Sequence, residues 1–215
     1  PTQPFPVLAL LDYGAGNIRS VEKALRAVGA DVQRMDSVHG LDRASGIVLP
    51  GVGAFDDCVN ALRRQELLGG IQKWIADGRP FLGICVGMQL LADRGLEHGE
   101  TPGLGWIPGE VRLIEPSDAA IKVPHMGWND VVMKKNNILF NELDENAIFY
   151  FLHSYYFDCK NAEDVIAVSD YGDRFTCAAN HGNVYGIQFH PEKSQNSGLR
   201  LLKAFCLSAH KEESK

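Results

Sequence analysis

A cysteine in the middle of the chain gives the first sign of covalent chemistry. Cys85 has glycines two residues to either side, Gly83 and Gly87, and it joins an apolar run of strand length to a helix-like segment. This pattern is typical of a nucleophile elbow, in which glycines allow a turn sharp enough to expose the reactive side chain. The first free amides of the helix, chiefly that of Val86, would then stabilise a thiolate. The alternative is a buried structural cysteine whose glycines serve only close packing.

A histidine far along the chain is a candidate base for this cysteine. His190 and Glu192 end a buried apolar segment, with Pro191 between them. In extended chain, residues two apart project to the same side, so Glu192 can orient the ring while His190 takes the Cys85 proton. A histidine at a strand end is often only structural, and its combination with the cysteine elbow is what favours catalysis.

Two glycine-containing loops follow predicted strands. The segment 50–53 reads Pro-Gly-Val-Gly, and such a sequence can turn backbone N–H groups into a cavity, as half of an oxyanion hole or as an ordinary loop. The segment 12–17 opens a helix as dinucleotide-binding loops do, but Arg19 stands where the third glycine belongs, which disfavours a cofactor there. Two interpretations of the segment 12–17 remain open: a tight turn from strand to helix, or a loop that lies beside the active site.

The elements that would position these residues change in character along the chain. Up to residue 95, near-continuous apolar runs alternate with segments of helical periodicity, as in a parallel sheet covered on both faces. Beyond it, shorter apolar segments between glycines and prolines indicate antiparallel hairpins, one of them at 130–133. We therefore expect a single α/β domain over residues 1–215, with a mostly parallel central sheet flanked by helices and additional antiparallel strands in the C-terminal half.

Composition excludes several classes of function. The net charge of -6 argues against a broad nucleic-acid surface, and no apolar run reaches membrane-spanning length. Five cysteines without C-x-x-C spacing indicate neither a disulfide framework nor a metal site, and residues 1–11 lack the features of a signal peptide. We expect a cytoplasmic protein without metal or cofactor. Two further histidines, His125 and His153, lie in aromatic and glycine-rich segments, where binding or interface roles compete with core packing.

Together, these motifs resemble the class I (triad-type) glutamine amidotransferases, and within them the glutaminase subunits of imidazole glycerol phosphate synthase, an enzyme of histidine biosynthesis. The class resemblance lies in residues 83–89 and 188–192, and the subfamily resemblance in 12–17, 49–55, 124–129 and 153–155. It extends from about residue 7 to residue 205. Val86 stands where the family often has leucine, and only its backbone N–H matters.

This resemblance implies that Cys85 attacks the side-chain amide of L-glutamine, forms a γ-glutamyl thioester and releases ammonia, with His190 and Glu192 completing a triad. It also implies two sets of contacts: Val86, Val52 and Gly51 for the oxyanion, and Gly53, Gln89, Ser154 and Tyr155 for the substrate. Ammonia would pass, shielded from water, to a TIM-barrel cyclase subunit that forms a heterodimer with this chain. The 51–53 strand would switch the activity on when that partner is loaded with its ligand.

The resemblance places Asn17, Trp128 and Lys193 near the subunit interface, with plain surface or core positions as the alternative. Other readings stay open. A paralogous glutaminase would share the motifs while supplying another synthetase, for example in nucleotide-sugar modification. A non-catalytic scaffold subunit would not need an intact Cys85, His190 and Glu192. A cysteine peptidase or redox chaperone on the same fold would leave the segments 12–17 and 124–129 unexplained.

Overall fold

An eight-stranded sheet runs through the middle of the molecule. The computed structural model describes residues 6–212. Five strands are parallel, in the order β2 (Asp31–Met35), β1 (Val7–Leu11), β3 (Gly46–Gly51), β4 (Phe81–Cys85) and β14 (Val184–Ile187). Three antiparallel strands extend the sheet, namely β13 (Asp173–His181), β12 (Val165–Tyr171) and β9 (Val132–Met133). The predicted α/β fold, parallel first and antiparallel later, is confirmed.

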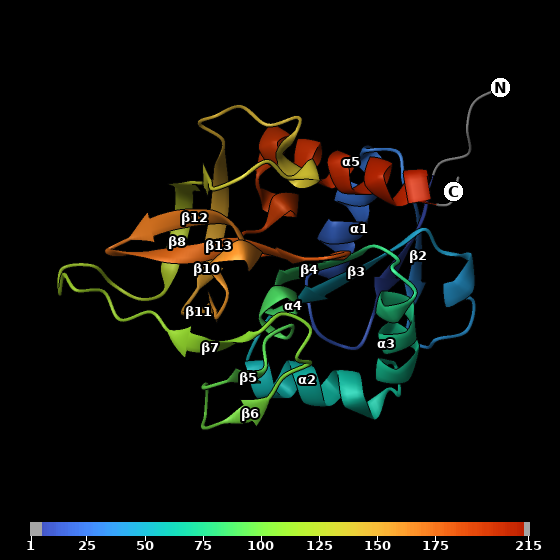
Figure 1. Cartoon of the computed structure of the whole chain (residues 1–215), viewed down its shortest axis with the longest axis horizontal. Helices are drawn as coiled ribbons and strands as arrows, with labels where there is room; N and C mark the ends of the chain where they lie inside the picture. Colours follow the sequence, from blue (N-terminus) through green and yellow to red (C-terminus); the bar gives the residue numbers. More distant parts are fainter. Residues whose placement is uncertain (1–5, 213–215) are drawn as a thin grey trace.

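Helices cover both faces of the parallel half of the sheet (Figure 1). On one face lie α1 (Ile18–Ala27) and α5 (Gln195–Glu212), and on the other α2 (Phe55–Arg64) and α3 (Leu68–Ala76). In α1, Val21 and Leu25 are four residues apart and both buried, as expected when one stripe of a helix packs on a sheet. The elbow helix α4 spans only Val86–Gln89. Single 3₁₀ turns occupy Leu41–Arg43, Ile138–Phe140, Ala162–Asp164 and Pro191–Lys193.

Two smaller sheets stand beside the antiparallel half. One contains β11 (Tyr155–Cys159), β7 (Gly109–Leu113), β5 (Arg94–Gly95) and β6 (Thr101–Pro102). The other pairs β8 (His125–Asp130) with β10 (Ile148–His153). The strand predicted at 130–133 is wrong in its bounds: β8 ends at Asp130, and β9 begins at Val132 in a different sheet. Pro124 and Gly127 hid β8, because both residues weaken a strand pattern.

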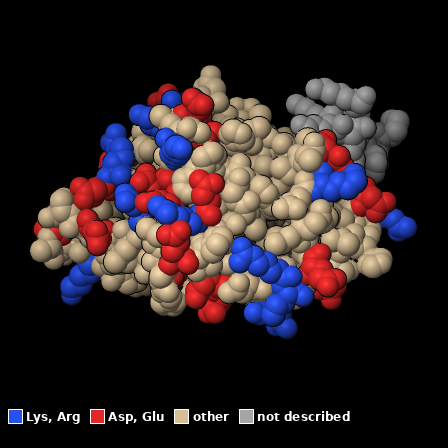
Figure 2. Space-filling view, turned by 60° about the horizontal axis from the view of Figure 1, so that its bottom comes forward, with Lys and Arg blue, Asp and Glu red and all other residues tan. Residues whose placement is uncertain are grey.

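Most of the buried apolar side chains among the described residues form one cluster, which includes residues of the parallel strands and of the smaller sheets. Within residues 6–212, no helix combines the length and the apolar character needed to cross a bilayer. On the face that Figure 2 shows, lysine and arginine side chains are interspersed with aspartate and glutamate, and no broad basic area forms there.

Candidate active site

The cysteine elbow forms where β4 meets α4. Cys85 is buried and has φ 56° and ψ -116°, a strained backbone conformation that L-residues adopt mainly at functional turns. The neighbouring glycines are required by contact with the backbone. A β-carbon on Gly83 would lie 2.5 Å from the Gly87 oxygen, and one on Gly87 would lie 2.0 Å from the Leu49 oxygen. The elbow therefore forms only when both positions lack side chains.

Strand β14 brings the histidine to the cysteine. It pairs with β4 in parallel, with Ile187 opposite Ile84, and the chain reaches His190 three residues later. Glu192 Oε1 lies 2.8 Å from His190 Nδ1, and the side chains of both residues are buried. Burial alone would lower the pKa of His190, but hydrogen bonds with Cys85 and Glu192 outweigh it and raise the pKa. Cys85 and His190 line one cavity of about 320 Å³.

Strand β3 lies on the other side of β4 and carries the predicted oxyanion segment. Gly51 pairs with Cys85, while Val52 and Gly53 line the cavity together with Val86. Two buried side chains hold the carbonyl groups of this segment. The Tyr13 hydroxyl donates to the Pro50 oxygen at 2.6 Å, and the Cys58 thiol lies 3.4 Å from the Val52 oxygen.

Burial raises the pKa of Tyr13 well above its usual value and that of Cys58 to about 11, so both groups keep their protons and act as donors. Tyr13 belongs to the 12–17 loop, so this loop lies beside the site, which was one of the two possibilities left open by the sequence.

Besides Gly53, the residues predicted to contact glutamine also line this cavity, namely Gln89, Ser154 and Tyr155. Gln89 Nε2 donates to the Tyr155 oxygen and to Gln188 Oε1, both at 3.0 Å. Gln188 is fully buried, and its Nε2 is 3.7 Å from the Cys85 sulfur. Sequence reasoning missed Gln188 as a site residue, and its signal was a polar amide inside an otherwise apolar strand end.

Two buried histidines lie together here: His153 lines the cavity, and His125 lies behind it. His125 Nδ1 is 3.0 Å from His153 Nε2, His153 Nδ1 is 2.8 Å from the Tyr155 oxygen, and Asn129 Nδ2 is 3.2 Å from His125 Nε2. Burial lowers the pKa of His125 to about 4. Burial also lowers the pKa of His153, to about 3, aided by the nearby His125 and His190 and opposed by the hydrogen bond to Tyr155. Both rings are neutral near pH 7.

Residues 9–209 match the family model described as glutamine amidotransferase class-I. The chain belongs to this family. It is 46% identical over 208 residues to the imidazole glycerol phosphate synthase subunit HisH of Salinibacter ruber, covering 95% of each protein. It is 45% identical to the protein of the same name from Caulobacter vibrioides, over 92% of this chain and 96% of that one. The predicted resemblance to these glutaminase subunits is confirmed.

Two solved structures share the fold at much lower identity. PurLQS from Thermotoga maritima matches with a TM-score of 0.74 and 20% identity, over 98% of this chain and all of that one. A crystal structure titled glutamine amidotransferase matches with a TM-score of 0.73, also at 20% identity, over 94% of this chain and 98% of that one. These two likenesses concern the fold alone.

The predicted interface residues of this glutamine amidotransferase lie in two places. Lys193 lines the cavity, and its Nζ is 5.7 Å from the centre of the Tyr150 ring. Trp128 is 47% exposed and meets Tyr150 edge to face on the outer side of the β8–β10 pair. Asn17 is half-buried at the start of α1 and does not line the cavity. Trp128 and Lys193 therefore both contact the ring of Tyr150.

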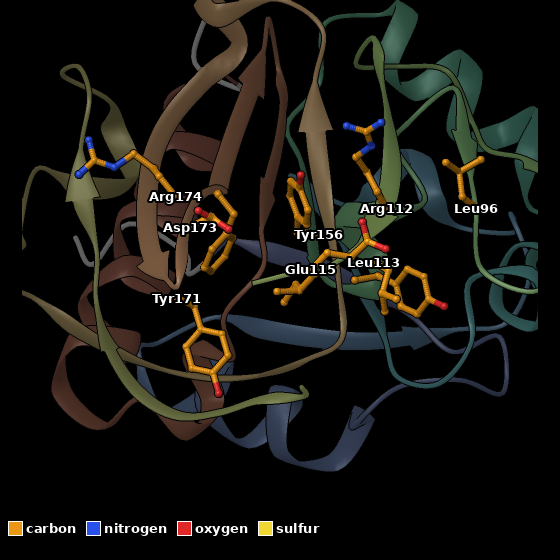
Figure 3. Close-up of a pocket in the computed structure, with 11 residues that line it drawn as sticks. Leu96, Arg112, Leu113, Glu115, Tyr156, Tyr171, Asp173 and Arg174 are labelled. Atoms are coloured by element: carbon orange, nitrogen blue, oxygen red, sulfur yellow. The ribbon is translucent and has the colours of Figure 1, made fainter. Parts of the chain in front are cut away.

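A second cavity, of about 500 Å³, shares the lining residue Tyr155 with the first. Figure 3 shows the wall of this second cavity. Arg112 and Arg174 stand apart on its wall, and each already has a carboxylate partner, Asp158 and Asp170 respectively. Tyr171 also lines this cavity, and its ring stacks on His125. Cys85 and His190 are not among its lining residues, and Tyr155 is the one described residue that lines both of these cavities.

Proposed function

We propose that this chain is the glutaminase subunit of an imidazole glycerol phosphate synthase. It hydrolyses L-glutamine to glutamate and ammonia and supplies the ammonia to a TIM-barrel cyclase subunit in histidine biosynthesis. The observation that carries the proposal is the buried His190–Glu192 pair, with His190 in the same cavity as the strained Cys85. The two relatives named HisH point to the same activity.

The reaction uses Cys85 as the nucleophile and His190 as base and then acid. Cys85 Sγ gives its proton to His190 and attacks the side-chain carbonyl carbon of glutamine. His190 returns that proton to the leaving nitrogen, so ammonia departs and a γ-glutamyl thioester remains. Water then attacks the thioester with His190 again as base, releasing glutamate and restoring the thiol. Glu192, 2.8 Å from Nδ1, holds the ring orientation and stabilises the imidazolium.

Charge that develops on the substrate oxygen needs donors near Cys85. The Val86 N–H at the start of α4 is one, and an amide of the Gly51–Val52 segment is the second. Each such donor contributes about 3 kcal/mol to lowering the barrier. Both Nε2 hydrogens of Gln89 are used in hydrogen bonds within the chain. Its amide oxygen is therefore the group that would accept a hydrogen bond from the α-ammonium group of glutamine. Gly53, Ser154 and Tyr155 line the cavity beside it.

The cyclase subunit would dock on the outer face of β8 and β10. This face exposes four large apolar side chains, among them Met126 at 66%. The other three are Trp128, Ile148 and Leu152. Contiguous apolar exposure of this kind marks interaction sites, and an aromatic anchor such as Trp128 is typical of their energetic centre. Leu152 and Lys193 also line the catalytic cavity, so a partner seated here would receive ammonia without exposing it to water.

The chain's cysteines fit a cytoplasmic location. All five are free thiols in the structure, as expected where glutathione keeps thiols reduced. The proposed enzyme therefore works in the same reducing compartment in which its nucleophile must remain unoxidised.

The test is ammonia release from glutamine by the complex of this chain with the cyclase subunit and its nucleotide ligand. We expect Cys85→Ala to abolish release while free ammonium still supports the cyclase reaction. Cys206→Ala is the matched control, because it truncates a buried cysteine of α5 outside the cavity and should leave the rate unchanged. Ammonia release that persists in Cys85→Ala would refute the proposed nucleophile.

Two other functions share the site and are separated by their partner. A paralogous glutaminase supplying another synthetase would hydrolyse glutamine but would not copurify with the cyclase, nor complement a histidine auxotroph. A non-catalytic scaffold would activate the cyclase equally well as Cys85→Ala when glutamine is the sole nitrogen source.

A further inference from the structure

A chain of hydrogen bonds joins the β8–β10 pair to the wall of the glutamine cavity. We propose that His125 and His153 are positioning residues for glutamine hydrolysis, which hold the Tyr155 carbonyl and, through it, the Gln89 amide in the orientation that substrate binding requires. The inference rests on the proposed function, because it assigns these groups to the binding of glutamine. It gives a role to two histidines whose sequence context left packing and binding equally open.

The donors and acceptors allow only one direction of hydrogen bonding. A carbonyl oxygen can only accept, so His153 Nδ1, 2.8 Å from the Tyr155 oxygen, carries its proton. Nε2 of that neutral ring is then an acceptor, and His125 Nδ1 donates to it across 3.0 Å. His125 Nε2 is left to accept from Asn129 Nδ2 at 3.2 Å. Each ring thus has one donor and one acceptor nitrogen, and both are used.

The Asn129 amide fixes the start of this chain. Its Oδ1 accepts from the Asp130 N–H at 2.8 Å, and its Nδ2 also donates to the Asp170 carbonyl at 2.8 Å. Turning the amide over would set two acceptors together at Asp170 and two donors together at Asp130. The amide therefore has one stable orientation, and it presents a donor to His125.

Packing keeps the two rings in this geometry. His153 lies directly opposite His125 in the antiparallel β8–β10 register, and both side chains are buried. The His125 ring stacks between two aromatic rings, with centroid distances of 4.7 Å to Phe151 and 4.1 Å to Tyr171. Because burial opposes the charged form, an added proton would break the chain, and the rings stay neutral and ordered.

The far end of the chain reaches the substrate wall. The Tyr155 oxygen accepts from His153 Nδ1 and from Gln89 Nε2, which uses both of its lone pairs. The second hydrogen of Gln89 Nε2 goes to Gln188 Oε1, so the plane of the Gln89 amide is fixed at two points. Loss of the His125 donor would leave a buried acceptor on His153 and loosen the ring that donates to the Tyr155 oxygen.

The first test is kinetic and uses the complex with the cyclase subunit. In His125→Phe the stacked ring is kept and the Nδ1 donor is lost, and we expect KM for glutamine to rise by about tenfold while kcat stays within about threefold. In His125→Asn the side-chain nitrogen takes the place of Nδ1, and KM should return to within about threefold of the wild type. Tyr171→Phe is the matched control, because it removes a hydrogen bond of the same aromatic cluster, to the Lys122 oxygen, that lies outside the chain.

The second test measures which ring nitrogen of each histidine carries a proton, and it does not depend on enzymatic activity. Nitrogen-15 NMR of the wild-type chain labelled at histidine should show His125 and His153 neutral at pH 7, each with its proton on Nδ1. A proton on His153 Nε2, or an unchanged KM in a folded His125→Phe variant, would overturn the inference. If that variant does not fold, His125→Asn and the NMR spectrum decide. A wild-type complex without glutaminase activity would refute the proposed function, and the NMR result would still test the hydrogen-bond chain.

Discussion

Replacing Gly87 by alanine would test whether the elbow is as closely packed as the structure shows. The added carbon would lie 2.0 Å from the Leu49 oxygen, whereas real β-carbons stay at least about 3.0 Å away, so β3 and the elbow must separate by about 1 Å. Overpacking of this kind costs about 1–3 kcal/mol of stability. Because Leu49 is two residues before Gly51, which pairs with Cys85, the displacement also separates the oxyanion segment from the nucleophile. A misplacement of about 1 Å lowers catalysis by about 100-fold.

The assay for Gly87→Ala is kcat/KM for glutamine hydrolysis in the complex, together with urea unfolding of the isolated chain. Gly69→Ala in α3 is the matched control, since its new carbon meets nothing within 4 Å. We expect the control to keep full activity and to gain up to about 0.5 kcal/mol in stability. Activity of Gly87→Ala within threefold of the wild type would show that the contact with Leu49 does not constrain the site.

Three further changes probe other parts of the site. Glu192→Gln removes the carboxylate that helps to raise the pKa of His190, and we expect kcat to fall by at least about 100-fold with little change in KM, measured by steady-state kinetics. Lowering the pH from 7 to 5 should reduce the free energy of unfolding by about 2 kcal/mol for each of His125 and His153. The reason is that the folded pKa values of about 4 and 3 lie below the ordinary 6.5, so the unfolded chain binds more protons in this range. Urea titrations should show a smaller loss in His125→Phe, and an equal loss would contradict this. Trp128→Ala should weaken binding of the cyclase subunit by about 2 kcal/mol, roughly 30-fold in Kd by calorimetry, and unchanged affinity would place the interface elsewhere.

The parts of the site that sequence predicts well are those set by local geometry. Glycines two residues to either side of Cys85 indicate the elbow, because the turn itself excludes side chains there. The pairing of His190 with Glu192 has a different local cause from the extended chain that the sequence predicted: Glu192 lies in the 3₁₀ turn Pro191–Lys193, and its Oε1 is 2.8 Å from His190 Nδ1.

The parts that sequence left open depend on which strands become neighbours. His125 and His153 meet only because β8 and β10 pair in a register that sets them opposite each other, and no pattern within either segment specifies that register. The same holds for Tyr13, whose hydroxyl reaches Pro50 because β1 and β3 are adjacent in the sheet. Such contacts belong to the topology of the fold, and local sequence carries little information about them.

The insertion of β14 between β4 and β13 has a consequence for biosynthesis of the protein on the ribosome. Synthesis proceeds from the N-terminus, so the segment that ends in Cys85 emerges long before the strand that leads to His190. Until residues 184–187 leave the exit tunnel, the hydrogen-bonding edge of β4 that β14 will occupy has no partner, and the thiol has no base beside it. The nascent chain therefore remains catalytically silent until β14 and the His190 that follows it have joined β4.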